Sequence, residues 1–239
     1  MFGVAGEVRL TCRPMVKAVL FDIDGTLIRS GGAGVRAFGK ALEMEFNLPG
    51  AAEGLQFAGR TDTGLVRQVF SARGIEPSAA NYDRFFASYL QWLAQMLTQT
   101  NGEICPAIPH FIEDLRRLRR PPMIGLLTGN IRLGAEIKLR HFHLWDYFET
   151  GGFADDHEDR NRIAAAARDR AGAKLGVELS GDEIVVVGDT PLDIECARAI
   201  GARCLAVATG GFTSAQLKTH QPAWLVENLQ AVEAAEICR

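Results

Sequence analysis

One short stretch near the N-terminus constrains the fold of this chain more than any other. An apolar run ends at Phe21, and Asp22 and Asp24 follow it, with Gly25 and Thr26 directly behind. A short, uninterrupted apolar block is typical of a strand buried on both faces, as in a parallel sheet. Residues two apart on a strand point the same way, so both carboxylates face one pocket at the end of this strand. Neighbouring carboxylates repel each other, so the pair predicts a bound cation or a shared proton.

Further strand patterns alternate with helical patterns along the chain. Strands are predicted at 123–127, 148–153, 184–188, 204–207 and 224–226, and helices near 111–120, 131–140, 162–175 and 191–200. Strands that alternate with helices form a parallel sheet with helices on both faces. We therefore predict an α/β fold with a doubly wound, Rossmann-type parallel sheet.

The segment 31–104 has a different pattern. Helical spacing fits near 33–47, 62–73 and 78–98, without a convincing strand pattern between them. About 70 residues are enough for a small helical bundle. We predict a helical subdomain at 31–104, inserted into an α/β core made of 15–30 and 105–239, with 1–14 as an N-terminal extension.

Composition excludes several classes of partner and setting. The net charge is −3 and no basic stripe is present, which argues against nucleic acid or an anionic membrane as the main partner. No apolar run has the length of a membrane span, and the N-terminus lacks the pattern of a secretory signal. The five cysteines are scattered without a C-x-x-C pair, so neither a disulfide framework nor a zinc site is expected. We expect a cytoplasmic protein.

Two phosphate-binding motifs overlap after the first strand, and neither fits well. One resembles a P-loop from Gly34 to Lys40, but Ala41 stands where the motif needs a hydroxyl for Mg²⁺. The other resembles a dinucleotide fingerprint from Gly32 to Ala37, but it does not directly follow the strand. A glycine-rich hinge is the better interpretation.

Chemically active residues follow several of the predicted strands. They are Asp22 and Asp24, Thr128, Asp189, and Arg160 in a loop. The carboxyl ends of parallel strands lie on one edge of the sheet, so these residues can meet in one crevice. Acidic oxygen ligands suit Mg²⁺. A carboxylate can attack phosphorus, a second acid can move the proton, and a cation with hydrogen-bond donors can hold the phosphoryl oxygens.

The order and spacing of these motifs resemble the haloacid dehalogenase (HAD) superfamily, in particular its phosphatase branch, such as the phosphoglycolate phosphatases. The motifs are Asp22-x-Asp24-Gly25-Thr26-Leu27, Thr128-Gly129, a basic residue at 160, and Gly188-Asp189-x-x-x-Asp193. The resemblance covers essentially the whole chain from Met15 onward. It implies that the inserted helices form a cap that closes over the site and selects the substrate.

The resemblance also implies roles for the motif residues. Asp22 matches the nucleophile, and Asp24 matches the general acid/base, whose backbone carbonyl also binds Mg²⁺. Asp22, Asp24 and Asp189 form the expected metal set. Asp193 matches a second acid of the same motif, either a ligand or a residue behind the ligands.

Phosphate and substrate contacts are expected from three further places. Thr128 matches the phosphate-binding hydroxyl, helped by the amide of Gly129, and Asn130 lies beside them. Arg60 lies in a loop before a cap helix, where an arginine can reach an anionic substrate. Thr61 or Asp62 next to it has an equally good interpretation as a helix N-cap.

The chain departs from the common pattern of the family at two places that bear on the site. Arg160-Asn161-Arg162 stands where most members have lysine, so Arg160 is the expected phosphate-binding cation and Arg162 is its rival. Arginine keeps the charge and can bind phosphate through two nitrogens. Arg29 replaces a frequent acidic residue in the hinge to the cap.

We therefore expect a Mg²⁺-dependent phosphatase that hydrolyses a small phosphomonoester, of the phosphoglycolate or sugar-phosphate type, through a phosphorylated Asp22. Asp24 argues against the dehalogenase branch, which does not need that acid. A phosphomutase of the same fold and a non-catalytic HAD-fold binding protein are the alternatives. The expected partner is a small phosphorylated metabolite, and the expected assembly is a monomer or a homodimer.

Overall fold

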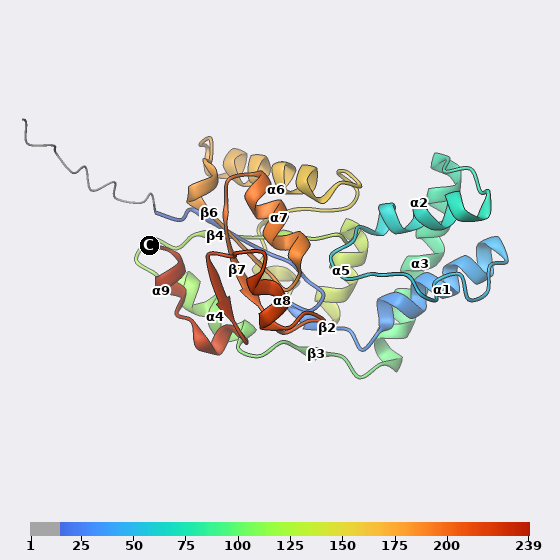
Figure 1. Ribbon diagram of the computed structural model, residues 1–239, viewed down its shortest axis with the longest axis horizontal. Coiled ribbons are helices and arrows are strands. Elements are labelled where there is room, and N and C mark those ends of the chain that lie inside the picture. Colours follow the sequence, from blue (N-terminus) through green and yellow to red (C-terminus); the bar gives the residue numbers. More distant parts are fainter. Residues whose placement is uncertain (1–14) are drawn as a thin grey trace, which may run out of the picture.

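The computed structural model describes residues 15–239, in which a parallel sheet lies at one end of the molecule and a group of helices at the other (Figure 1). The sheet has the strand order β5-β4-β1-β6-β7-β8, and every neighbouring pair is parallel. Its strands are β1 (Ala18–Phe21), β4 (Met123–Leu127), β5 (Thr150–Gly152), β6 (Ile184–Gly188), β7 (Arg203–Val207) and β8 (Trp224–Val226). The predicted doubly wound α/β sheet is confirmed.

Alternation along β1 divides the core into two layers. Val19 and Phe21 pack with residues of α4 (Ile108–Arg116), α5 (Arg132–His141) and α9 (Ala234–Ile237). Ala18 and Leu20 point to the other face, where α6 (Arg160–Leu175), α7 (Pro191–Ala199) and α8 (Ser214–Lys218) cover the sheet. Because β1 is apolar on both sides, it can lie in the middle of this sheet between β4 and β6.

The register of the central strands places the predicted site residues side by side at the same edge of the sheet. Phe21 pairs with Leu126 on β4 and with Val187 on β6. The residues just beyond these positions are Asp22, Thr128 and Asp189, so all three lie at the carboxyl edge of the sheet. This is the edge where open α/β sheets bind their ligands.

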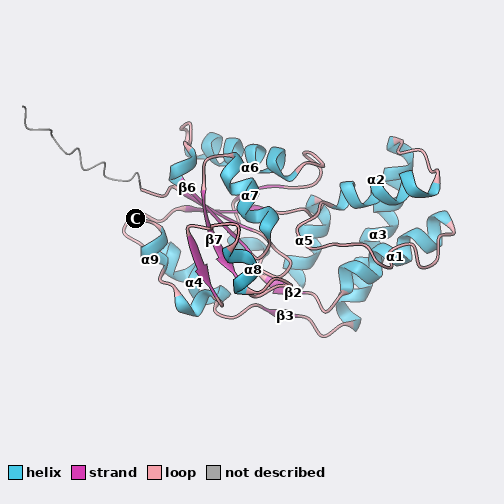
Figure 2. Cartoon of the chain, viewed as in Figure 1, coloured by secondary structure: helices cyan, strands magenta, loops and turns pink. Residues whose placement is uncertain are grey.

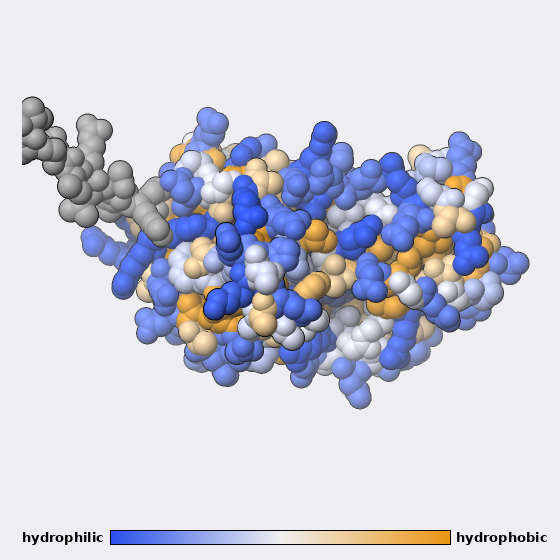
Figure 3. Space-filling model, viewed as in Figure 1, coloured by the Kyte–Doolittle hydropathy of each residue, from blue (hydrophilic) through white to orange (hydrophobic). Residues whose placement is uncertain are grey.

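The cap consists of three helices. They are α1 (Ala33–Phe46), α2 (Asp62–Arg73) and α3 (Ala79–Gln99). Their hydrophobic cluster also includes Ile131 and Ala154 of the core. Phe38 and Phe85 pack edge to face at its centre, with ring centroids 4.8 Å apart. Figure 2 shows these helices away from the sheet, and Figure 3 shows hydrophobic residues exposed between them on a largely hydrophilic face.

Two short strands join the cap to the core. β2 (Ile28–Arg29) pairs antiparallel with β3 (Glu103–Ile104), and the predicted boundaries of the subdomain lie next to this pair. Arg29 donates to Glu103 over 2.7 Å and to the carbonyl of Thr209 over 2.9 Å. The unusual arginine therefore connects the hinge to the core.

Three further predictions concern a helix end, the cysteines and membrane spans. The predicted end of the helix at 111–120 is wrong, since α4 stops at Arg116. A proline disfavours helical backbone at the residue before it, so Pro121 prevents the helix from continuing to residue 120. Within 15–239, the four cysteines are buried free thiols, and no helix is long and apolar enough to cross a membrane. Cys12 and the predicted extension 1–14 lie outside the described residues.

Candidate active site

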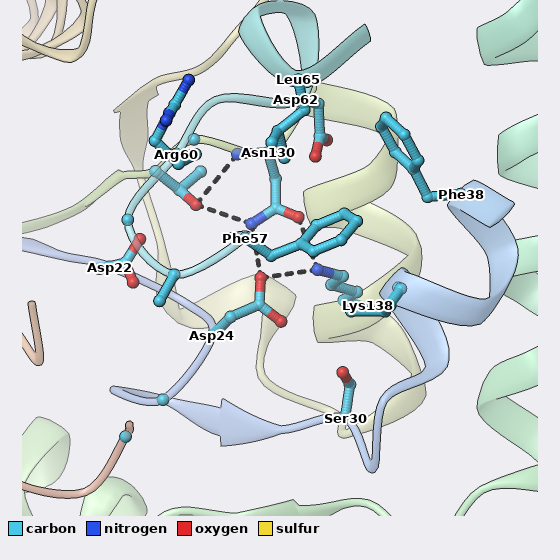
Figure 4. Close-up of a pocket in the computed structure, with 18 of the residues that line it drawn as sticks. Asp22, Asp24, Ser30, Phe38, Phe57, Arg60, Asp62, Leu65, Asn130 and Lys138 are labelled. Atoms are coloured by element: carbon cyan, nitrogen blue, oxygen red, sulfur yellow. Dashed lines mark hydrogen bonds and ion pairs between the residues drawn. The ribbon is translucent and has the colours of Figure 1, made fainter. Parts of the chain in front are cut away.

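The two carboxylates after β1 have different surroundings. Asp22 continues the ladder, with its N–H donating to the carbonyl of Val187 over 2.9 Å, and its side chain is buried. The side chain of Asp24 is 42% exposed and faces the pocket under the cap (Figure 4). Positive φ at Gly25 lets the chain turn here, and a Cβ at this position would lie only 2.5 Å from Oδ2 of Asp189.

Arg160 reaches Asp22 from the first turn of α6. Its Nη2 lies 2.9 Å from Oδ1 of Asp22 and also donates to Asp193, while Nη1 donates to the carbonyl of Gly59 over 3.1 Å. The guanidinium is buried, whereas Arg162 is exposed. Of the two rival arginines, the structure places Arg160 in the site.

Three buried acids lie close together beside β1. Oxygens of Asp22, Asp189 and Asp193 come within 4.8 Å of one another. Asp189 accepts a hydrogen bond of 2.9 Å from Thr26, and Asp193 accepts from Thr190 at the start of α7. The third acid of this cluster is Asp193, and the side chain of Asp24 is not part of it. The resemblance assigns only the backbone carbonyl of Asp24 to the metal.

Burial makes Asp22 and Asp189 difficult to ionise without a cation. It raises the pKa of Asp22 to about 7 although Arg160 lowers it, and it raises the pKa of Asp189 well above the usual range, with Asp193 adding to the shift. A divalent cation among them would favour the charged forms. The donors are all oxygens, so the cluster fits a hard ion such as Mg²⁺.

The predicted phosphate-binding turn follows β4. Thr128 is fully buried, and its Oγ1 lies 2.8 Å from Nδ2 of Asn130. The same Nδ2 lies 2.8 Å from Oδ2 of Asp24. Asn130 thus links the turn to Asp24, in addition to lining the pocket.

The sequence interpretation missed Lys138. This residue of α5 is buried, and its Nζ lies 2.6 Å from both Oδ2 of Asp24 and Oδ1 of Asn130. A signal was present, because Lys138 falls on the same helical stripe as the buried residues Ile131, Ala135 and Leu139. A lysine within an apolar stripe is unusual unless its charge is paired.

The loop before α2 closes the site from the cap side. Thr61 is the N-cap of α2, and a Cβ atom at Gly129 would overlap the carbonyl oxygen of Arg60. Asp62 makes two hydrogen bonds to the turn after β4. Its N–H donates to the carbonyl of Gly129 over 2.7 Å, and its Oδ2 accepts from the N–H of Ile131 over 2.9 Å. Sequence reasoning gave Asp62 only a possible capping role.

Arg60 does not approach the acids in this arrangement. Its side chain is exposed, donates to Gln68 over 3.3 Å and points away from Asp22 and Asp24 (Figure 4). Arg60 is nevertheless among the residues that line the pocket, and its binding of substrate stays a prediction.

A pocket of about 260 Å³ lies between cap and core. Its core wall carries the polar residues described above, and its cap wall is mixed, with Phe38, Phe57, Asp62, Leu65 and Tyr89. The pocket therefore has a charged wall on the core side and a partly apolar wall on the cap side.

A family model described as haloacid dehalogenase-like hydrolase matches residues 19–207, which is most of the chain. The chain belongs to this family. The predicted superfamily is therefore confirmed.

Relatives of this HAD hydrolase are phosphatases. The phosphoglycolate phosphatase of Cereibacter sphaeroides (strain ATCC 17029) is 32% identical over 203 residues, covering 82% of this chain and 87% of that protein. The probable phosphatase IndB of Dickeya dadantii is 27% identical over 230 residues, covering 92% and 94%. Both likenesses extend over cap and core.

Solved structures support the same fold. CbbY from Rhodobacter sphaeroides, in complex with phosphate, superposes with a TM-score of 0.69 at 16% identity and covers 90% of this chain and 95% of its own. A predicted phosphatase from Clostridium acetobutylicum gives a TM-score of 0.68 at 15% identity, with 94% and 99% covered.

Proposed function

We propose that this HAD hydrolase is a Mg²⁺-dependent phosphatase that hydrolyses a small phosphomonoester through a phosphorylated Asp22. The single observation that supports this most is the contact between Asp22 and Arg160, 2.9 Å apart, at a sheet edge that also carries Thr128 and the acid cluster. The phosphatase relatives support the same class of reaction.

Asp22 has one oxygen free to attack. Oδ1 accepts from Arg160, and no described residue donates to Oδ2. In the first step Oδ2 attacks phosphorus, the bond from phosphorus to the leaving oxygen breaks, and an acyl phosphate forms on Asp22. In the second step water attacks phosphorus, which releases phosphate and restores the carboxylate.

The phosphoryl oxygens have donors available in the turn after β4. Oγ1 of Thr128 accepts from Asn130, so the hydroxyl hydrogen is left to donate. The N–H of Gly129 donates to no described residue. Arg160 adds a permanent positive charge, and a Mg²⁺ held by Asp22, Asp189 and the backbone carbonyl of Asp24, with Asp193 beside it, would neutralise phosphoryl charge.

We assign the proton transfer to Asp24. Its Oδ2 accepts from Lys138 and Asn130, so Oδ1 is the oxygen that is left for the leaving group. Asp24 gives a proton to the leaving oxygen in the first step and takes one from the attacking water in the second.

The pocket favours a small substrate. A volume of about 260 Å³ suits a leaving group of a few heavy atoms. The relatives named phosphoglycolate phosphatase make phosphoglycolate our first choice, and sugar phosphates are the next to test.

The test is phosphate release from a panel of phosphomonoesters that includes phosphoglycolate and several sugar phosphates. We expect release with Mg²⁺, its loss in chelator, and its loss in Asp189→Asn. Asp146→Asn is the matched control, because the side chain of Asp146 is 90% exposed. Undiminished release in chelator would refute the metal role. A rearranged sugar phosphate without phosphate release would indicate a mutase, and no turnover of any substrate would favour a binding protein.

A further inference from the structure

Lys138 places a buried positive charge beside the proposed acid/base. Its side chain is 5% exposed, and its Nζ lies 2.6 Å from Oδ2 of Asp24 (Figure 4). The cap covers it, since a Cβ at Gly34 of α1 would lie 3.4 Å from the same nitrogen. A buried ammonium needs acceptors, and Oδ2 of Asp24 and Oδ1 of Asn130 supply them. Asp24 is the only carboxylate within ion-pair distance of Lys138 in the described chain.

Asn130, Lys138 and Asp24 are each hydrogen-bonded to the other two. The ammonium of Lys138 only donates, so the atom of Asn130 that faces it at 2.6 Å is Oδ1. The amide nitrogen therefore faces the other way and donates to Oδ2 of Asp24 and to Oγ1 of Thr128, each over 2.8 Å. Lys138 thus fixes the orientation of Asn130 as well as that of Asp24.

We propose that Lys138 is the positioning residue of Asp24, which rests on the proposed function. Two donors hold Oδ2 of Asp24, so the carboxyl group has one orientation and Oδ1 is presented to the leaving oxygen. Lys138 does not take the role of phosphate-binding cation, because Arg160 is the residue in contact with Asp22.

This role makes a prediction about leaving groups. An alkyl phosphomonoester releases an alkoxide that needs the proton of Asp24, whereas p-nitrophenyl phosphate releases a phenolate that leaves without it. The ratio kcat/KM reports the steps up to departure of the leaving group, before water is needed. Loss of positioning should therefore lower kcat/KM for the alkyl substrate selectively.

The experiment compares kcat/KM for both substrates in wild type, Lys138→Met and the control Lys40→Met, whose lysine is on the cap surface beside Glu43. We expect Lys138→Met to lower the alkyl value about 100-fold, the scale of general acid catalysis, and the p-nitrophenyl value only a few-fold. Lys138→Gln keeps an N–H donor and should give an intermediate ratio, and it serves as the second variant if the Met variant does not fold. Equal losses on both substrates would overturn the proposal.

A double-mutant cycle shows whether Lys138 acts through Asp24. In the Asp24→Asn background, Lys138→Met should cause no further loss on the alkyl substrate. Independent, multiplying losses would contradict the positioning role. If wild type hydrolyses neither substrate with Mg²⁺, the proposed phosphatase function itself fails, which is a different outcome from equal losses in an active enzyme.

Discussion

Arg160 is the residue on which the charge balance of the site depends most. It is buried between Asp22 and Asp193 and contacts both carboxylates. Its removal leaves two buried acids without their cation, which costs about 3–5 kcal/mol in comparable pairs. We therefore expect Arg160 to matter for stability as well as for catalysis.

We expect Arg160→Ala to abolish phosphate release and to lower the midpoint of thermal unfolding. Arg162→Ala should change neither, because Arg162 is exposed. Arg160→Lys keeps the charge but has only one donor nitrogen, so it should restore stability more than activity. Steady-state kinetics and thermal unfolding of the three variants provide the test. An inactive Arg162→Ala beside an active Arg160→Ala would transfer the role to Arg162.

At the residue scale, the sequence predicted the groups that follow strands. Asp22, Asp24, Thr128 and Asp189 are recognisable because a buried strand ends at a fixed edge of the sheet. Lys138 was missed because it lies in the middle of a helix, where lysines are ordinarily solvated. Its burial depends on the cap helices that pack over it, and this contact is not visible in a local pattern.

At the scale of elements, Asp62 joins α2 of the cap to the turn before α5. Burial raises its pKa to about 6, while Lys138 lowers it. The folded protein then holds the proton more tightly than the unfolded chain, so this group's contribution to stability is present below about pH 4 and is lost as the pH rises to about 6.

We therefore expect a pH-dependent difference between wild type and Asp62→Asn. Between pH 4 and pH 6.5 the metal-free wild type should lose on the order of 2 kcal/mol more stability than the variant, since one pKa unit is worth about 1.4 kcal/mol. Asn keeps an oxygen that can accept from the N–H of Ile131, so the substitution removes the charge of Asp62 without removing this hydrogen bond. Thermal unfolding of both proteins across this range is the measurement. Parallel pH profiles would show that Asp62 does not titrate in this way.

The contact between Gly129 and the loop before α2 leads to another prediction. A Cβ atom at Gly129 would overlap the carbonyl oxygen of Arg60, so Gly129→Ala should push the cap loop away from the phosphate-binding turn. We expect a lower kcat and a higher KM for phosphomonoesters. Gly39→Ala, where the Cβ meets Ala52 at an ordinary 3.4 Å, should leave kinetics unchanged. Wild-type kinetics in Gly129→Ala would mean that the loop is not held against the turn during turnover.

The elements themselves were predictable to different degrees. The cap helices at 33–47, 62–73 and 78–98 correspond closely to α1, α2 and α3, because their apolar residues recur over several turns. The strands β2 and β3 were missed, since each has two residues and no periodicity. The start of α6 was placed two residues late, at 162, so Arg160 was assigned to a loop although it lies in the first helical turn.

At the scale of the whole molecule, the core has a hydrophobic cluster on each face of the sheet, the cap has a third, and the pocket lies between cap and core. The core supplies nearly all the polar residues of the site, which is why the reaction class follows from sequence motifs. The cap lines its side of the pocket with Phe38, Phe57, Leu65 and Tyr89. We expect substrate choice to depend on how these side chains enclose the leaving group, and no motif encodes that shape.

The proposed mechanism depends above all on the phosphorylation of Asp22 during turnover. The most direct measurement is a single turnover with a phosphomonoester labelled at phosphorus, quenched in acid and followed by mapping of the labelled peptide. We predict that the label lies on the peptide containing Asp22 in wild type and is absent in Asp22→Asn, which releases no phosphate. Phosphate release by Asp22→Asn at the wild-type rate, or a label on another peptide, would contradict the account.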